Sequence, residues 1–157
     1  MSDISVRVEI DDTLDNDTIE IVVQASEKNS DVDALIRKLS ALTQRRLKAT
    51  DQRGSECYID ESEIISVCSA DRSVRIITQD YVYTSNFTLR SIEEQLSKRH
   101  FIKISRYELV NSDKIVKFDF TIGGTLRLEL DGGIETWASR RYIPLIRKHL
   151  SGEGENE

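Results

Sequence analysis

The sequence predicts a mainly β protein, α+β overall, built from antiparallel strands with a few short helices. Apolar and polar residues alternate over 116–122 and again over 126–130, which is the pattern of strands with one buried face. Gly123-Gly124 separates these two segments, and Asp131-Gly132-Gly133 follows the second. Glycine accepts the positive φ that tight hairpin turns require, so both positions favour hairpins. Helical spacing of apolar residues is confined to short stretches, and sheets are therefore expected to form the core.

The first 44 residues predict a strand, a turn, a second strand and a helix. Period-2 alternation covers 4–10 and 19–23, with polar residues between them. Asn29 or Ser30 can cap a helix whose apolar residues then recur at helical spacing. A unit of this size is too small for a robust core of its own. We therefore expect residues 1–44 to pack on the rest of the chain or on a second copy, as a dimerisation or regulatory element.

The main domain is expected over residues 45–150, in which strands predominate. Runs rich in Ile and Val at 63–68 and 73–78 favour strands, and residues 134–138 follow the second glycine turn as another. One helix is expected between them at 88–96, because Thr88 is a good N-cap and the apolar residues after it face one side. This arrangement predicts a sheet-rich domain interrupted by a single helix before its last hairpins.

The end of the chain predicts a short helix and a tail. Ser139 is the expected helix cap, and Pro144 is tolerated only near the start of a helix that runs to about Leu150. Residues 151–157 are rich in Gly and Glu and contain no apolar side chain. Such a composition predicts a disordered acidic tail.

Charge is unevenly distributed along the chain. The net charge at pH 7 is −6, which by itself disfavours binding to nucleic acid. Residues 1–35, however, hold ten acidic and two basic side chains, whereas residues 98–149 hold eleven basic and six acidic ones. A polyanion is therefore expected to bind to the basic segment, while the acidic ends limit nonspecific association.

The sequence predicts a cytoplasmic protein that does not insert directly into a membrane. No segment approaches the roughly 20 apolar residues that a membrane span needs. The first residues lack the basic and apolar regions of a secretory signal. Cys57 and Cys68 are too few for a disulfide framework, so free thiols in a reducing compartment are expected.

Patterns that indicate catalysis or metal binding are poor. His100 and His149 are far apart, and neither has cysteine or histidine neighbours at the spacing of zinc ligands. The acidic residues at 11–17 lack the glycine and the closing glutamate of an EF-hand loop. Neither glycine pair is followed by phosphate-loop residues. We expect no enzymatic activity, no metal and no cofactor.

Two basic and polar stretches, 101–115 and 137–142, each end a strand in a cluster of hydrogen-bond donors. Their Arg and Lys residues can neutralise phosphates, and an arginine can also bond to guanine in a bidentate manner. Asn111 carries the donor and the acceptor that fit adenine. A charged, solvated sheet edge is a more common reason for such a pattern, so composition leaves both interpretations open.

The order of motifs along residues 45–150 resembles the LytTR DNA-binding domain of bacterial response regulators. Several matching motifs follow one another over this length, and their order is far more specific than any one of them. The matching motifs are Glu63-Ile-Ile65, Ala70-Asp-Arg72, Tyr81-Val-Tyr83, the capped helix from Thr88 to Leu96, Phe101-Ile-Lys-Ile-Ser-Arg106, Leu109-Val-Asn111 followed by Ile115, and Ser139-Arg-Arg-Tyr142 with Leu145.

The resemblance implies stacked antiparallel sheets and a binding mode in which loops, rather than a recognition helix, enter successive major grooves of double-stranded DNA. It implies that Asn111 and Arg141 reach base edges. Further contacts to bases or phosphates are implied for Lys103, Ser105, Arg106, Lys114, Ser139, Arg140 and Tyr142, and for Arg72 and Arg75 in a third loop. Cys68, Val74 and Ser105 depart from residues that the family often has, so the sequence preference of the third loop is the least transferable.

Residues 1–44 are too few for the phospho-receiver domain that usually precedes this domain. The segment instead resembles the prefix of stand-alone LytTR regulators. We therefore expect a sequence-specific transcriptional regulator that binds two adjacent imperfect repeats as a homodimer. The resemblance also implies a small regulatory membrane protein as a partner. The alternative is a protein-protein interaction module that uses the same β domain without DNA specificity.

Overall fold

The computed structural model describes residues 5–14, 19–43, 45–121 and 123–151. Its contacts divide the chain into two units, Met1–Gln44 and Arg45–Glu157. The expected tail lies outside the described residues, except for Ser151, which ends the last helix. None of the helices in the described ranges has both the length and the hydropathy needed to cross a membrane.

The N-terminal unit contains the expected helix, α1 (Ser30–Thr43). Asn29 caps it, because its Oδ1 accepts hydrogen bonds from the backbone N–H groups of Asp31 (3.1 Å) and Val32 (3.0 Å). Asp31 and Asp33 lie in the first turn, where carboxylates are favoured by the positive end of the helix. The sequence therefore correctly located the start of this helix.

The two strands expected at 4–10 and 19–23 are not formed in the described part of these segments. Residues 5–10 and 19–23 have no regular secondary structure, and the side chains of Val6 and Ile10 are 88% and 90% exposed. Alternation shows which side chains a strand would bury. The strand itself forms only when a neighbour takes its backbone hydrogen bonds and covers its apolar face. The expectation at residue 4 lies outside the described residues.

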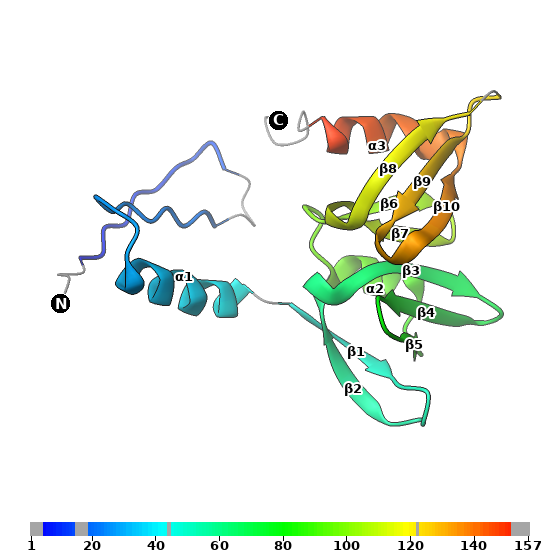
Figure 1. Ribbon diagram of the computed structural model, residues 1–157, viewed down its shortest axis with the longest axis horizontal. Helices are drawn as coiled ribbons and strands as arrows, with labels where there is room; N and C mark the ends of the chain where they lie inside the picture. The colour runs from blue at the N-terminus through cyan, green and yellow to red at the C-terminus, as the bar shows by residue number, and fades with distance from the viewer. Residues whose placement is uncertain (1–4, 15–18, 44, 122, 152–157) are drawn as a thin grey trace. The chain divides into compact units, whose positions relative to one another are not determined.

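The second unit contains two antiparallel sheets (Figure 1). The first has the strand order β2-β1-β5-β4-β3-β7-β6 and the second β10-β9-β8. The strands of the first sheet are β1 (Arg46–Thr50), β2 (Glu56–Asp60), β3 (Ile64–Ala70), β4 (Ser73–Thr78), β5 (Val82–Ser85), β6 (Phe101–Ser105) and β7 (Glu108–Asn111). Those of the second are β8 (Ile115–Phe120), β9 (Leu126–Leu130) and β10 (Ile134–Ala138). This arrangement confirms the mainly β fold class.

Two helices complete this unit. Thr88 caps α2 (Leu89–Gln95) as expected, since its hydroxyl accepts a hydrogen bond from the backbone N–H of Ser91 at 3.1 Å. The last helix differs from the expectation at its start. Ser139 makes no side-chain cap bond and is followed by a 3₁₀ turn, Arg140–Tyr142, before α3 (Ile143–Leu150) begins with Pro144 in its first turn. Proline fits there because the first-turn N–H groups have no partner within the helix.

Two hydrophobic clusters hold the sheets and helices together. The first joins β1 to β5 with α2 and includes Val67 and Ile92. The second joins β6, the three-stranded sheet and α3, and includes Leu128 and Ile146. β3 contributes side chains to both clusters, because Ile65 belongs to the second cluster while Ile64 and Val67 belong to the first. This double burial explains the nearly continuous apolar run at the start of β3.

Candidate nucleic-acid interface

Three chain segments lie side by side where β3, β6 and β10 end. The backbone N–H of Ser69 donates to the carbonyl of Tyr107 at 2.8 Å, which joins the end of β3 to the β6–β7 turn. The N–H of Ser139 donates to the carbonyl of Ile104 at 2.9 Å, which joins the end of β10 to the end of β6, just before the same turn. We call residues 69–73, 104–108 and 138–142 together the loop end of the domain. Sequence-distant segments that carry the expected DNA contacts thus meet along one side.

The β3–β4 turn presents Arg72 on a two-residue loop. Asp71 and Arg72 have φ values of 50° and 69°, the left-handed conformation that this hairpin turn usually fills with Asn-Gly. Holding a residue with a Cβ in that conformation costs on the order of 1 kcal/mol. Arg72 is exposed and bonds to no other residue in the described ranges. Arg75 lies nearby on β4 and approaches the carboxylate of Asp71 at 3.6 Å.

The β6–β7 turn presents an arginine and a tyrosine. The hydroxyl of Ser105 accepts a hydrogen bond from the N–H of Tyr107 at 3.2 Å and so shapes the turn. The guanidinium of Arg106 lies 5.9 Å from the centre of the Tyr107 ring, which is itself 60% exposed. Lys103 lies further back on β6, where its ammonium is 3.7 Å from the carboxylate of Glu93 on α2. Arg106 rather than Lys103 is therefore available at the tip.

Among residues 139–142, some side chains hold the surrounding turns in place and one extends into solvent. The Arg140 guanidinium donates to the carbonyl of Gly123 and packs beside Gly124, so it holds the β8–β9 turn against the loop end. Tyr142 is half-buried against the second hydrophobic cluster. Arg141 is exposed and makes no hydrogen bond or ion pair with another described residue. Its guanidinium is thus free for an external acceptor.

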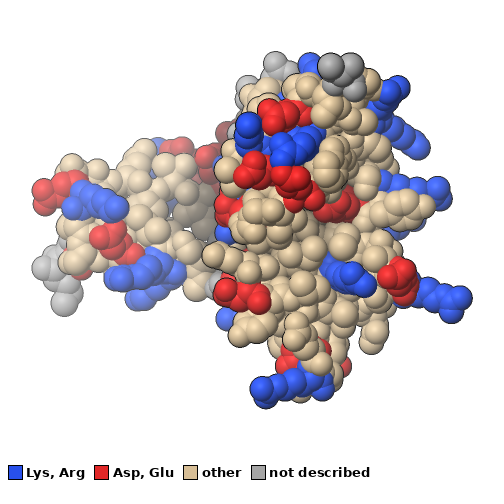
Figure 2. Space-filling view, turned by 45° about the vertical axis from the view of Figure 1, so that its right-hand side comes forward, with Lys and Arg blue, Asp and Glu red and all other residues tan. Residues whose placement is uncertain are grey.

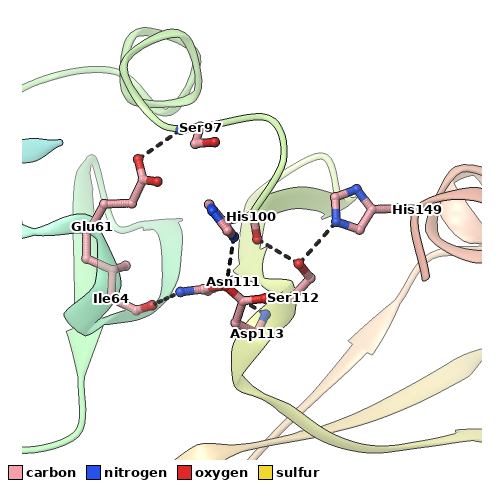
Figure 3. A network of polar contacts seen from close by, with 8 residues as sticks. All are labelled: Glu61, Ile64, Ser97, His100, Asn111, Ser112, Asp113 and His149. Atoms are coloured by element: carbon pink, nitrogen blue, oxygen red, sulfur yellow. Dashed lines mark hydrogen bonds and ion pairs between the residues drawn. The ribbon is translucent and has the colours of Figure 1, made fainter. Parts of the chain in front are cut away.

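Asn111 lies away from the loop end, contrary to the role implied for it. β7 begins at Glu108 in the loop end and reaches Asn111 at its opposite end. The Asn111 side chain is 2% exposed, donates to the carbonyl of Ile64 at 2.9 Å and accepts from the N–H of Asp113 at 3.1 Å (Figure 3). Both halves of its amide are occupied within the protein. In this structure the amide is not exposed to a ligand, and the base-reading role implied for Asn111 stays a prediction.

Lys114 lies at the same distant end as Asn111. It belongs to the 3₁₀ turn Ser112–Lys114 that precedes β8, and its ammonium approaches the carboxylate of Asp131 at 3.9 Å. Around it the chain is held by polar contacts among His100, Ser112 and His149, which Figure 3 shows linking the residue before β6, the 3₁₀ turn and α3. These contacts fasten the end of the sheets opposite the loop end.

A model of the LytTr DNA-binding domain family matches residues 54–151, which is more than half of the chain. The chain belongs to this family. The fold is also similar to that of a solved LytTr DNA-binding domain from Bacillus cereus, with a TM-score of 0.63 and 22% identity, covering 68% of this chain and 96% of that one. The family resemblance read from the motif order is thereby confirmed.

Curated relatives of the chain come from Staphylococcus aureus. An uncharacterized HTH-type transcriptional regulator of strain NCTC 8325 is 28% identical over 131 residues, covering 83% of this chain and 88% of that protein. Its counterpart in strain N315 is 28% identical over 144 residues, covering 85% of this chain and 97% of that protein. In the described part of the LytTr domain, α2 and α3 are separated by β6 to β10, so these two helices do not form a helix-turn-helix.

The loop end of the LytTr domain is positively charged. Arg72, Arg106, Arg140 and Arg141 are exposed there, and Arg75 is exposed nearby on β4. Figure 2 shows basic side chains projecting one above another along one side of the molecule. Within the described ranges, no group of His, Cys, Asp and Glu side chains is arranged to hold a metal ion. The positive charge of this surface favours an anionic ligand.

One carboxyl group is partly buried beneath this surface. Glu108 accepts a hydrogen bond from the Thr136 hydroxyl at 2.6 Å, and its burial raises the pKa of the carboxyl above its usual value of 4.5. The nearby Cys68 thiol also has a raised pKa, first because of burial and then because of Glu108. A thiol with a raised pKa holds less of the reactive thiolate at neutral pH.

A Glu108→Gln variant is expected to be more stable than the wild type at neutral pH. The folded state holds the Glu108 proton more tightly than the unfolded chain, so this group's contribution to stability is present below pH 4.5 and is lost as pH rises through the folded pKa. Glutamine keeps an acceptor for Thr136 without the buried charge. Thermal unfolding from pH 4 to pH 8 should show a Tm difference between variant and wild type that grows with pH. A difference that is constant or shrinks would contradict this account of Glu108.

Sequence reasoning missed two features of the loop end. Tyr107 is an exposed aromatic side chain next to Arg106, and the β8–β9 turn is held in place by Arg140. The first could have been found, since an aromatic residue in a polar turn next to Arg106 is unusual in a simple solvated turn. The second could not, because Gly123 and Arg140 meet only through the fold.

Proposed function

We propose that the chain is a transcriptional regulator that binds double-stranded DNA in a sequence-specific manner through the loop end. The observation that carries this proposal is the row of three turns from which Arg72, Arg106 and Arg141 extend without an ion-pair partner in the described residues. Guanidinium groups that are free of internal partners can bond to phosphates or to guanine edges without first breaking a bond within the protein.

The three turns suit a mode in which loops enter successive major grooves. Arg141 is assigned to base edges, because it follows a backbone anchored by the Ser139–Ile104 bond and its own side chain is unengaged. Arg72, Arg75 and Arg106 are assigned mainly to phosphates. Ser139 and Tyr142 support the Arg141 backbone, since the N–H of Tyr142 donates to the carbonyl of Ser139 at 3.0 Å. Arg140 positions the neighbouring turn.

The regulatory role is supported by the relatives. The Staphylococcus aureus proteins named as transcriptional regulators match along 88–97% of their own length. The similarity therefore includes much more than an isolated DNA-binding module. By this argument the chain acts on transcription by occupying a site on DNA.

A salt titration of binding to duplexes from the upstream region of the encoding gene tests this proposal. If three or four phosphates are neutralised per copy, log affinity should fall against log salt concentration with a slope of about −3 to −4. One fragment should resist nonspecific competitor DNA. Weak binding to every fragment with the same slope would indicate a DNA-binding domain without specificity. Binding that does not respond to salt would contradict the electrostatic role of the loop end.

A further inference from the structure

The outer edge of β8 is an unpaired sheet edge with exposed apolar side chains. β8 is the last strand in the order β10-β9-β8, and no other strand in the described part of the Arg45–Glu157 unit pairs with its outer side (Figure 1). Val116 is 62% exposed, and Phe118 and Phe120 are each 49% exposed. Exposed edges of stable proteins are usually blunted, because unpaired N–H and C=O groups invite another strand. An unpaired edge that also exposes aromatic rings is suited to bind another β-strand, which would take up its backbone hydrogen bonds and cover the rings.

A groove runs beside this edge, between β8 and α3. It has a volume of about 330 Å³ and is lined by Phe118, Phe120, Leu126, Ile146, Arg147 and Leu150. Phe118 and Phe120 contact each other edge to face, with ring centres 6.5 Å apart. The Arg147 guanidinium lies 4.3 Å from the centre of the Phe120 ring and covers one side of it. The apolar surface therefore continues from the strand edge into a concave site.

We propose that the occupant of this edge is a second copy of the chain, whose β8 pairs with it in antiparallel orientation about a two-fold axis at Phe118. In this register Phe118 lies opposite the partner's Phe118. Lys117 then lies opposite the partner's Asp119, and the same pair forms again across the axis. The rings of the two Phe118 side chains would extend the apolar surface over both grooves.

The charge pattern of β8 selects this register. An axis at Lys117 would place two ammonium groups opposite each other, and an axis at Asp119 would place two carboxylates opposite each other. Like charges directly opposite on neighbouring strands are destabilising, whereas opposite charges are favourable. Within one copy, Lys117 and Asp119 lie 3.7 Å apart on the same face of the sheet, where Asp119 also pairs with Arg127 at 3.4 Å. Directly opposite residues of a second β8 would place their side chains on this same face. Of these three registers, only the one with its axis at Phe118 brings opposite charges together.

The pairing leaves the proposed DNA-binding surface open. The carboxyl end of β8 leads into the β8–β9 turn, which Arg140 fastens to the loop end. Because the two β8 strands would run in opposite directions, the two loop ends would point away from each other. This consequence rests on the proposed function. A dimer formed through β8 would not require residues 1–44. With its loop ends directed away from each other it would bind two separate DNA segments, and not the two adjacent repeats expected from the sequence.

The test is the oligomeric state of the full chain, measured by sedimentation equilibrium from 1 to 200 µM. We expect a dimer, a loss of affinity of tenfold or more in Lys117→Asp, and recovery in the double variant Lys117→Asp/Asp119→Lys, which restores opposite charges across the axis. Lys98→Asp, the same charge change at an exposed position outside β8, should dimerise like the wild type. A monomer at every concentration, or a dimer unaffected by Lys117→Asp, would overturn the proposal.

A cysteine at the axis gives a second measurement if the charge variants fold poorly. Directly opposite antiparallel residues have Cα atoms about 4.5–5.5 Å apart, which a disulfide can span. Phe118→Cys should therefore form a disulfide-linked dimer under mild oxidation, whereas Glu135→Cys on β10 should not. Failure of Phe118→Cys to link would overturn the register. DNA binding by Lys117→Asp is measured alongside. If the variant no longer dimerises but each copy still binds DNA with wild-type affinity and salt dependence, the two functions are separate, and a failure of the dimer is not a failure of DNA binding.

Discussion

An Arg141→Ala variant is expected to bind its specific duplex about 5- to 150-fold more weakly than the wild type, a loss of roughly 1–3 kcal/mol. Arg141 is exposed at the loop end and bonds to no other described residue, so its guanidinium is available to a guanine edge. For the same reason its removal should leave the Tm unchanged. Affinity for the cognate duplex and for a scrambled duplex, measured at one salt concentration, would show whether the loss is specific.

The control for this variant is Arg90→Ala on α2. Arg90 is also an exposed arginine, and its ion pair with Glu94 is a single i,i+4 contact at 3.7 Å. The two variants therefore carry the same change in net charge. If both lose affinity equally on cognate and scrambled DNA, Arg141 contributes only general charge. Wild-type affinity of Arg141→Ala for the cognate duplex would remove the base-reading assignment altogether.

Replacing Asn111 with alanine is expected to reduce stability rather than DNA affinity. The buried carbonyl of Ile64 would lose its donor, and the 3₁₀ turn after β7 would lose its cap at Asp113. An unsatisfied buried carbonyl costs about 1–3 kcal/mol, which corresponds to a decrease in Tm of roughly 5–15 °C for a domain of this size. Thermal unfolding followed by circular dichroism measures this effect.

DNA binding by the folded fraction of Asn111→Ala should equal that of the wild type when measured well below its Tm. Asn86→Ala, at an exposed asparagine between β5 and α2, should change neither property. An unchanged Tm combined with lost cognate binding would mean that Asn111 leaves its buried position to contact DNA. That outcome would restore the role implied by the family resemblance.

These two variants separate residues that a motif places in one class. Asn111 and Arg141 both stand in polar stretches that end strands, and the resemblance assigns both to base edges. In the structure the Asn111 amide on β7 forms a hydrogen bond to Ile64 on the neighbouring strand β3, whereas the Arg141 guanidinium extends from a short turn. Burial and hydrogen-bond partners, rather than residue type, decide which of them is available to a ligand.

Much of the fold could be predicted from the sequence because its signals are local. Alternation over β8 and β9 and the glycine turns indicated the last hairpins, and Thr88 and Asn29 indicated where α2 and α1 begin. The order of motifs indicated the family. Each of these depends on residues within one or two turns of the chain, where propensity, capping and side-chain period act directly.

The failures of sequence reasoning occurred where formation of an element depends on a partner. The alternation at 4–10 and 19–23 equals that of true strands, yet the described residues there do not form them. β3, in contrast, lacks clean alternation but forms a central strand, because sheets and helices cover both of its faces. Local pattern defines a strand's faces, and long-range pairing decides whether the strand exists.

By itself, the sequence determined the fold class, the family and the basic segments that meet at the loop end. Only the tertiary structure decided that Arg72, Arg106 and Arg141 lie on one surface, that Asn111 and Lys114 lie at the opposite end, and that the edge of β8 is unpaired. Loop positions depend on strand order and register, which are set by contacts between segments far apart in the chain. The spacing of residues along the sequence therefore does not give the distances between these loops in the folded protein.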